Sequence, residues 1–535
     1  PVLHEEAADM AAVAPGQPSV AAPPAASPVT AAESRQGVKK AQVAGGHAQG
    51  ATAQLADSEF STEAYDHVEE TGFVGVNRAP LSTFSIDVDT ASYANVRRHL
   101  QGESLPPAGA VRIEELINYF DYDYPAPRGD APFSVYTEVA PAPWAPEHKL
   151  LHIGLQGRVI ETKNLPPRNL VFLLDVSGSM SDANKLPLLK RSFSALLSTL
   201  GEKDRVAIAV YAGASGLVLP STPANQKGRI LEALEHLEAG GSTNGGEGIE
   251  LAYRTAQESF QKGGVNRVIL ATDGDFNVGT TSESELVRLI EQKRDSGVFL
   301  TVLGYGMGNY KDSTLEKLAD HGNGNYAYID SYEEAQKVLV AEGGANLVTI
   351  AQDVKIQVEM NPRLVGAYRL IGYENRRLAT EDFANDKKDA GEIGAGHSVT
   401  ALYELLDPAQ ARVALKEESL RYQANAAPIG SDSELCNVKL RFKQPLGKES
   451  RLEQFPVLTP AQAVAPSANF RFSAAVASFG MLLRNSEYKG QATYAMVTGL
   501  ADSARGNDSA GYRREFGELV HKAQRLSGQS AQIAR

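Results

Sequence analysis

Between about residues 168 and 343, short apolar runs alternate with stretches in which apolar residues recur at helical spacing. The apolar runs predict strands over 170–176, 206–211, 268–272, 298–305 and 326–329. The helical spacing predicts helices over 186–200, 229–237, 249–260 and 283–293. Strands that are apolar on both faces and alternate with helices are typical of a doubly wound, mostly parallel α/β sheet. In such a sheet the ligand site lies at the carboxyl ends of the strands.

On both sides of this region the pattern changes to alternation of apolar and polar residues. It predicts strands over 133–139 and 149–155 before the region and, after it, over 354–358, 368–373, 399–405 and 436–442. Alternation is typical of antiparallel sheets with one buried face. We therefore expect a β-sandwich-like domain built from 128–165 plus 345–460, with an α/β domain, 166–344, inserted into it. This hypothesis requires the strands of 133–155 to pair with those of 354–442.

The two ends of the chain differ from this central part. Residues 1–60 are rich in Ala, Pro, Gln, Gly and Ser and have no hydrophobic period, which predicts a disordered tether. Residues 80–127 contain an alternating run at 83–89 and a helical stripe over 111–120, which predict an α+β segment. Apolar residues at helical spacing predict a C-terminal helical region over 466–530.

Composition and charge narrow the classes of function. The chain has 535 residues, which corresponds to about two to four domains, and a formal net charge of −13. It lacks the basic footprint of a general nucleic-acid binder, so a cationic or metal-bridged partner fits better. Cys436 is the only cysteine, which excludes an intramolecular disulfide and a cysteine-based zinc site. No apolar run reaches the roughly 18 residues of a membrane span, and the start at Pro1 fits removal of a leader that could carry a lipid anchor.

Oxygen-bearing side chains gather in three loops next to the predicted strands. Asp175, Ser177 and Ser179 form a D-x-S-x-S motif at the end of the first strand of the α/β region. Thr243 lies in a glycine-rich loop before a helix, and Asp273 follows the strand 268–272 in a T-D-G motif. Hydroxyl and carboxylate oxygens are ligands that Mg²⁺ prefers. Two carboxylates at most balance the charge of the ion. If either of them acts through water, the ion remains electrophilic, and an open coordination position then favours an acidic oxygen from a partner.

These five residues closely resemble the metal-ion-dependent adhesion site of von Willebrand factor type A domains, which have a Rossmann-like α/β fold. The resemblance implies that Ser177 and Ser179 coordinate a divalent cation directly, that Thr243 joins in one state, and that Asp273 completes the site with Asp175. The implied cation is Mg²⁺ or Mn²⁺, with Ca²⁺ as an alternative. The implied function is non-enzymatic, a protein-binding or adhesion-type module in which an Asp or Glu carboxylate of a protein partner completes the metal coordination.

Further segments of the chain resemble bacterial YfbK-type proteins, namely 83–93, 112–120, 391–397 and 479–484. The likeness covers about residues 80–525. In that family the A domain lies between a characteristic N-terminal segment and a C-terminal domain of unknown function, and members are generally regarded as envelope-associated. The resemblance therefore implies a location in the bacterial cell envelope, either in the periplasm or anchored to the outer membrane.

Other hypotheses for the same cation remain open at this point. One is a metal-dependent hydrolase of phosphoesterase type, in which the cation acts as a Lewis acid. Another is an assembly factor that works with an ATPase. For the binding module, we expect Asp175→Ala to abolish metal binding and leave the fold intact, because this loop is surface-exposed in A domains.

Two more features of the sequence suggest polar sites. The stretch from Asp87 to Ser92 imitates a second oxygen cluster, but Asp89 or Thr90 as the N-cap of a helix over 91–100 is the better interpretation. His397 follows Gly396 in a predicted loop with no second histidine or cysteine nearby, which favours a turn or packing role.

Overall fold

The computed structural model describes residues 65, 68–241, 245–274, 283–306, 312–343, 347–386, 388, 390–415, 432–445, 447, 449–460 and 465–533. The chain divides into residues 1–58 and residues 59–535, and the description below concerns the second unit. The predicted tether, 1–60, and the predicted site residue Thr243 lie outside the described residues. In the described part of the chain we find no helix with both the length and the apolar character that a membrane crossing requires.

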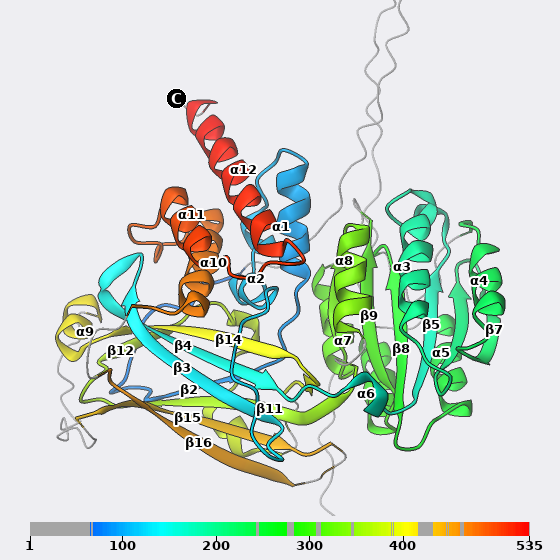
Figure 1. Ribbon diagram of the computed structural model, residues 1–535, viewed down its shortest axis with the longest axis horizontal. Coiled ribbons are helices and arrows are strands. Elements are labelled where there is room, and N and C mark those ends of the chain that lie inside the picture. Colours follow the sequence, from blue (N-terminus) through cyan, green and yellow to red (C-terminus); the bar gives the residue numbers. More distant parts are fainter. Residues whose placement is uncertain are drawn as a thin grey trace, which may run out of the picture. The chain divides into compact units, whose positions relative to one another are not determined.

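A six-stranded sheet forms the α/β layer, drawn in green shades in Figure 1. Its strand order is β10-β9-β8-β5-β6-β7, and all neighbours are parallel except β6 and β7, which are antiparallel. The strands span Arg168–Asp175 (β5), Arg205–Tyr211 (β6), Ser215–Pro223 (β7), Val265–Thr272 (β8), Phe299–Tyr305 (β9) and Tyr326–Ile329 (β10).

Helices cover both faces of this sheet. Alternate residues of the central strand point to opposite faces, so Leu170 and Phe172 pack in the core beneath α3 and α4, whereas Val171 and Leu173 pack in the core beneath α5, α6 and α7. The helices span Leu186–Ser198 (α3), Lys227–Glu235 (α4), Gly245–Glu258 (α5), Glu283–Asp295 (α6), Asp312–His321 (α7) and Tyr332–Gln336 (α8). The predicted doubly wound, mostly parallel α/β fold is confirmed.

Two further sheets are built from segments before and after this layer. One has the order β1-β12-β14-β4-β3, with β1 at Val74–Gly75, β3 at Phe133–Ala142, β4 at Ala145–Gly157, β12 at Ala367–Leu370 and β14 at Ser398–Leu406. The other has the order β13-β11-β15-β16, with β2 also paired to β11; these strands span Leu81–Ser85 (β2), Thr349–Met360 (β11), Ile393–Gly394 (β13), Glu434–Lys443 (β15) and Ser450–Leu458 (β16).

Strands on the two sides of the α/β layer share a sheet. β4 pairs antiparallel with β14, and Leu151 lies opposite Tyr403. The hairpin of β3 and β4 turns at the buried Trp144. The pairing that the insertion hypothesis requires is therefore present, while the exact domain boundaries given above stay predictions.

A group of helices packs on one face of the sheet that contains β4. Leu150 of β4 shares a core with these helices, whereas Leu151 and Ile153 face the core between the two sheets. The helices of this group span Ala91–Gln101 (α1), Ile113–Asn118 (α2), Ala468–Arg484 (α10), Tyr494–Ser503 (α11) and Tyr512–Ile533 (α12). Figure 1 shows them together beside β3, β4 and β14. In the sequence, α1 and α2 come before the whole α/β layer, whereas α10, α11 and α12 come after it. A further helix, α9, spans Pro408–Leu415.

One buried histidine lies where β4 meets α10. The ring of His152 is fully buried, with Nε2 2.7 Å from the Tyr124 hydroxyl and Nδ1 3.0 Å from the Ser473 hydroxyl. Burial lowers the pKa of His152 from 6.5 to about 4, although the charge of Glu138 acts in the opposite direction. The folded protein therefore holds this ring neutral at a pH where the unfolded chain protonates it.

We expect this histidine to make the protein sensitive to mild acid. The unfolded state binds the proton more tightly, so stability is complete above pH 6.5 and falls as the pH drops toward 4, by about 3 kcal/mol in total. Urea unfolding between these pH values measures the loss. His152→Gln should remove most of this dependence, whereas His521→Gln, at an exposed position of α12, should leave it unchanged. An unchanged slope in His152→Gln would contradict the prediction.

Candidate metal centre

The structure places four of the predicted ligands at the carboxyl edge of two adjacent parallel strands. Asp175 is the last residue of β5, and Ser177 and Ser179 lie in the turn that follows it. Asp273 comes directly after β8, which pairs with β5. The fifth residue, Thr243, belongs to the segment outside the description.

Backbone hydrogen bonds attach the glycine-rich loop to the loop of the D-x-S-x-S motif. The Gly240 N–H donates to the Val176 carbonyl at 2.8 Å, and the Gly178 N–H donates to the Gly241 carbonyl at 3.1 Å. Gly241 has φ 86°, in the left-handed region, and a Cβ there would lie 3.2 Å from the Gly213 nitrogen. The loop that leads to Thr243 therefore starts beside the first loop.

Asp175 joins the ends of three neighbouring strands. Its Oδ1 accepts from the Ser177 N–H at 2.9 Å, and its Oδ2 accepts from the hydroxyls of Tyr211 at 3.0 Å and Thr272 at 3.1 Å. Burial raises the pKa of Asp175, as does the charge of Asp273, whereas the hydrogen bonds from Ser177 oppose this shift. Asp175 itself is 0% exposed, although Gly178 in the loop that follows it is exposed, so a change at Asp175 alters a buried group and not a surface one. The carboxylate points into the protein, where it accepts hydrogen bonds from the buried hydroxyls of Tyr211 and Thr272.

The two serine hydroxyls lie close enough to act on one ligand. Ser177 Oγ is 3.0 Å from Ser179 Oγ. Ser177 is buried, Ser179 is half-buried and Gly178 between them is exposed. The motif thus presents two neutral oxygens at the rim of the sheet edge, above the buried carboxylate.

Lys185 brings a positive charge into the same place. Its Nζ lies 3.2 Å from Asp273 Oδ2 and donates to the Ser179 carbonyl at 3.0 Å. The stem of this side chain passes Gly306, where a Cβ would lie 2.3 Å from Lys185 Cε. The sequence analysis did not identify Lys185, because nothing in the residues around a lysine before a helix indicates whether its side chain points into a site. The ammonium therefore pairs with one of the predicted metal ligands, Asp273.

We expect Lys185→Met to tighten Mg²⁺ binding by about tenfold or more, because the ammonium competes for Asp273 and repels a second positive charge. Methionine keeps a long apolar stem beside Gly306. Calorimetric titration of the metal-free protein measures the change. Lys190→Met, on the same helix but bonded to the carbonyls of Glu235 and Leu237, should bind Mg²⁺ as the wild type does. Weaker binding in Lys185→Met would mean instead that Lys185 holds the loop in its binding conformation.

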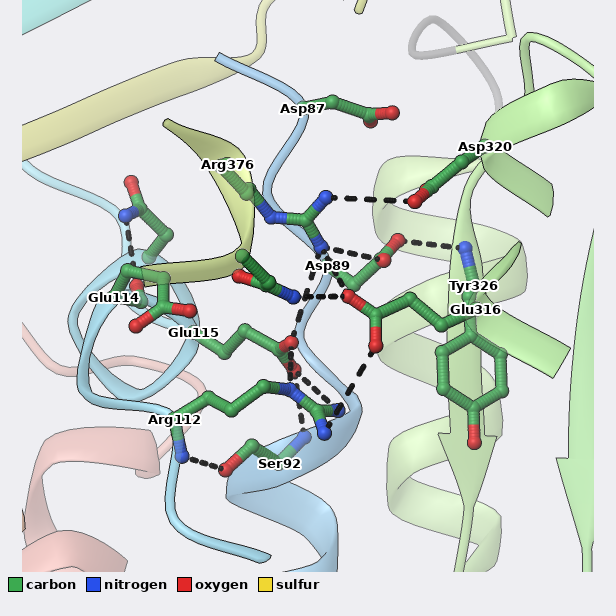
Figure 2. Close-up of polar contacts among 12 residues, drawn as sticks. Asp87, Asp89, Ser92, Arg112, Glu114, Glu115, Glu316, Asp320, Tyr326 and Arg376 are labelled. Atoms are coloured by element: carbon green, nitrogen blue, oxygen red, sulfur yellow. Dashed lines mark hydrogen bonds and ion pairs between the residues drawn. The ribbon is translucent and has the colours of Figure 1, made fainter. Parts of the chain in front are cut away.

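A second group of carboxylates lies apart from these loops. Oxygens of Asp89, Glu115 and Glu316 lie within 4.8 Å of one another, and all three residues are buried (Figure 2). Arg376 Nη2 lies 3.0 Å from Asp89 and 2.9 Å from Glu316. Arg112 forms an ion pair with Glu115. Two guanidinium groups already satisfy these carboxylates, so the cluster has the chemistry of a structural ion-pair network rather than of a metal site.

This network corrects one interpretation of the sequence. Thr90 occupies the N-cap position of α1 but makes no side-chain cap hydrogen bond. The Asp89 carboxylate accepts from the Tyr326 N–H at 2.7 Å and from Arg376 instead of capping the helix. The interpretation of Asp89 or Thr90 as a capping side chain is therefore wrong, because tertiary partners compete for Asp89.

His397 has the turn role that the sequence favoured. Its N–H donates to the Gly394 carbonyl at 3.1 Å, and its carbonyl accepts from the Gly157 N–H at 2.8 Å. These bonds fix the turn that leads into β14. Burial lowers the pKa of the His397 ring.

Three family models match successive parts of the chain. The model described as "von Willebrand factor" matches residues 59–152, and "von Willebrand factor type A domain" matches residues 169–341. The model described as "Uncharacterized protein YfbK, C-terminal" matches residues 345–526. The second of these covers the α/β layer together with all three loops of the candidate site. Von Willebrand factor type A domains mediate protein–protein interactions and often bind a divalent metal.

Relatives extend the match over most of the chain. YfbK of Escherichia coli is 45% identical over 473 residues, which are 86% of this chain and 81% of that protein. Inter-alpha-trypsin inhibitor heavy chain H4 of Sus scrofa is 24% identical over 391 residues, which are 68% of this chain and 40% of that protein. A solved structure, von Willebrand factor type A from Catenulispora acidiphila, has 15% identity and a TM-score of 0.42, covering 74% of this chain and 91% of that one. The chain therefore belongs to the YfbK family of proteins with a von Willebrand factor type A domain.

Proposed function

We propose that the protein is a metal-ion-dependent protein-binding module, in which Mg²⁺ or Mn²⁺ at the D-x-S-x-S loop holds a carboxylate of a protein partner. The observation that carries this proposal is that the Ser177 and Ser179 hydroxyls lie 3.0 Å apart at the carboxyl edge of the sheet, while the Lys185 ammonium contacts both Asp273 and the Ser179 carbonyl. Ligands of open α/β sheets bind at this edge.

The chemistry of the donor set fits a hard divalent cation. Serine hydroxyls and aspartate carboxylates are oxygen ligands, and Mg²⁺ keeps several waters when few protein groups bind it. Ser177, Ser179 and Asp273 would hold the ion, directly or through water, and Thr243 would join them. Asp175, anchored by Tyr211 and Thr272, would keep the serine loop in place and add negative charge beneath it. A bound divalent ion supplies an electrophilic position that an acidic oxygen can fill.

The partner that this site suits is a protein with an exposed Asp or Glu side chain. The serine hydroxyls add no negative charge, so Asp175 and Asp273 at most balance the charge of the ion, and a carboxylate from outside remains attractive where one of the two acts through water. The metal would then serve recognition and not turnover. We place this interaction in the bacterial cell envelope, with a lipid anchor on a leader, because the YfbK-type segments imply that location.

Calorimetry of the EDTA-treated protein with Mg²⁺ and Mn²⁺ tests the metal part. Saturable binding is expected for the wild type and should be lost in Ser177→Ala. Ser181→Ala is the matched control, because Ser181 lies in the same turn but outside the motif. If the wild type fails to bind either ion, or if Ser177→Ala binds like the control, the metal site is refuted.

Line broadening of the acetate proton signal tests the carboxylate part. With Mn²⁺ bound, acetate in excess should broaden, and the broadening should vanish with EDTA or in Ser177→Ala. Because Mn²⁺ binding is followed separately by the relaxation of water, the two parts of the proposal are distinguished. Bound Mn²⁺ without any effect on acetate would refute recognition of a partner carboxylate.

A further inference from the structure

A pocket of about 620 Å³ lies next to the buried ion-pair network and away from the candidate metal centre. Residues 68–74, the start of α2, the start of α7 and the segment Glu374–Arg377 form its walls. Pockets that hold small molecules have volumes of roughly 300 to 1,000 Å³. Of the predicted metal ligands, the four that the structure describes do not line this pocket.

The pocket has an acidic lining. Its ionisable residues are five glutamates and two arginines, namely Glu69, Glu70, Glu114, Glu316, Glu374, Arg112 and Arg377. Arg112 is already paired with Glu115 outside the pocket, and Arg376 is paired with Glu316. Behind the wall, one guanidinium, that of Arg484, serves both Glu374 at 2.9 Å and Glu70 at 3.7 Å. The lining therefore carries more negative charge than the neighbouring arginines balance.

The carboxylate of one of these glutamates lacks a hydrogen-bond partner among the residues that the structure describes. Glu114 is 1% exposed, and neither of its carboxylate oxygens has a hydrogen-bond partner in the described part of the chain. In Figure 2 no dashed line reaches the carboxylate of Glu114, whereas Glu115, the next residue, is held by Arg112 and by the Ser92 N–H. The Asn118 side chain donates to the backbone carbonyl of Glu114 and not to its carboxylate. A buried carboxylate without a partner is costly when ionised.

The surrounding backbone fixes the position of this carboxylate. Gly372 has φ 74°, and a Cβ there would lie 2.5 Å from Glu114 Oε2. The carboxylate thus rests against a bare backbone position, and a larger residue would displace it. Burial raises the pKa of Glu114 to about 7, with the charge of Glu374 acting in the same direction and that of Arg484 against it. A cation from outside would supply the hydrogen-bond donors that this carboxylate lacks among the described residues, and its charge would add to that of Arg484.

An organic cation fits this arrangement better than a metal ion. A divalent ion requires about six oxygen ligands at 2.0–2.6 Å, whereas Glu316, Glu374 and Glu70 are committed to arginines. The pocket is also many times larger than an ion. An ammonium or guanidinium on an alkyl stem needs one strong acceptor and fills such a volume with its apolar part.

We propose that this pocket binds an organic cation, an alkylammonium or alkylguanidinium group, with Glu114 as its charge partner. Free amines and the basic side chain of a peptide share this chemistry. Binding here is independent of the metal-dependent site, since the two share no residue.

Butylguanidinium and butylurea are matched probes, because they have nearly the same shape and only the first is charged. Calorimetry on the full chain in EDTA should show butylguanidinium binding at least about tenfold more tightly than butylurea. Glu114→Gln, which preserves the shape of the side chain, should lose this preference. Glu103→Gln, which removes the same charge at a surface pair with Arg525, should retain it. A parallel titration with an arginine-containing peptide and with free agmatine distinguishes the two sources of the cation.

Equal binding of the two probes to the wild type would overturn the proposal, and this comparison needs no variant to fold. An unchanged preference in Glu114→Gln, with circular dichroism equal to that of the wild type, would overturn it too. So would Mg²⁺ or Ca²⁺ binding that depends on Glu114, measured in a separate titration without EDTA, while butylguanidinium shows none. Because the titrations with butylguanidinium and butylurea contain EDTA, loss of the metal site leaves their outcomes unaffected.

Discussion

Replacing Arg376 with methionine is expected to lower the free energy of unfolding by roughly 3–5 kcal/mol. Arg376 is buried and pairs with Asp89 at 3.0 Å and Glu316 at 2.9 Å, and Asp320 lies 3.8 Å from its other terminal nitrogen. Its removal leaves these carboxylates together without their shared cation. Burial already raises the pKa of Asp89, and the remaining negative charges would raise it further.

The effect should be large because Arg376 connects three regions of the chain. Asp89 precedes α1, Glu316 and Asp320 belong to α7 of the α/β layer, and Arg376 lies between β12 and β14. The connection of α7 to the sheets would therefore weaken together with the overall stability. Chemical denaturation followed by circular dichroism measures the first effect, and hydrogen exchange in α7 measures the second.

Arg377→Met is the matched control, because Arg377 is the next residue and is exposed. It should change the stability by less than about 0.5 kcal/mol. Adding Glu316→Gln to Arg376→Met should restore part of the loss, since it removes one of the unpaired charges. If Arg376→Met were as stable as the control, the ion-pair network would not hold the regions together.

The second large effect is expected for Asp175→Asn, which should weaken Mg²⁺ binding by about a hundredfold or more. Asparagine keeps an oxygen for the hydroxyls of Tyr211 and Thr272 but removes the negative charge beneath the serine loop. The fold should therefore remain. Calorimetric titration gives the affinity, and thermal unfolding in EDTA shows whether the variant is folded.

Asp175→Ala is a less informative change than the sequence suggested. It leaves the fully buried Tyr211 hydroxyl without its acceptor, which costs about 1–3 kcal/mol. Asp182→Asn is the better control, because Asp182 is near Lys185 but largely exposed. Mg²⁺ binding by Asp175→Asn equal to that of this control would remove Asp175 from the site.

The strands of the α/β layer were predictable because they are buried on both faces. β5 alternates Leu170 and Phe172 on one face with Val171 and Leu173 on the other, so the central positions 170–174 are all apolar. The edge strand β7 was missed, since Leu217 and Val218 are exposed there and no buried period results. The helices α7 and α8 and the strand β16 were missed as well. α7 has only a narrow buried stripe, at Leu315, Leu318 and Ala319, and charged residues cover the rest.

Two neighbouring glutamates show that the local sequence pattern does not predict which charged residue finds a partner. Glu114 and Glu115 follow each other at the start of α2, yet Glu115 is paired with Arg112, whereas the Glu114 carboxylate has no hydrogen-bond partner in the described part of the chain. Residues one apart on a helix point in different directions, so their surroundings come from different elements. Lys185 and Asp273 likewise meet only because β5 and β8 are adjacent in the sheet.

The sequence by itself determined the α/β class, the positions of its main strands along the chain, and the edge at which Asp175, Ser177, Ser179 and Asp273 lie. These features depend on the spacing of apolar residues along the chain and on motifs at the ends of strands. Both are properties of residues that are close together in the sequence. Only the tertiary structure decided that Lys185 enters that edge, that Asp175 is buried, and that Asp89 pairs with Arg376 across 287 positions of sequence. Such contacts depend on which elements pack together, and burial then decides whether a charge finds a partner or is left without one.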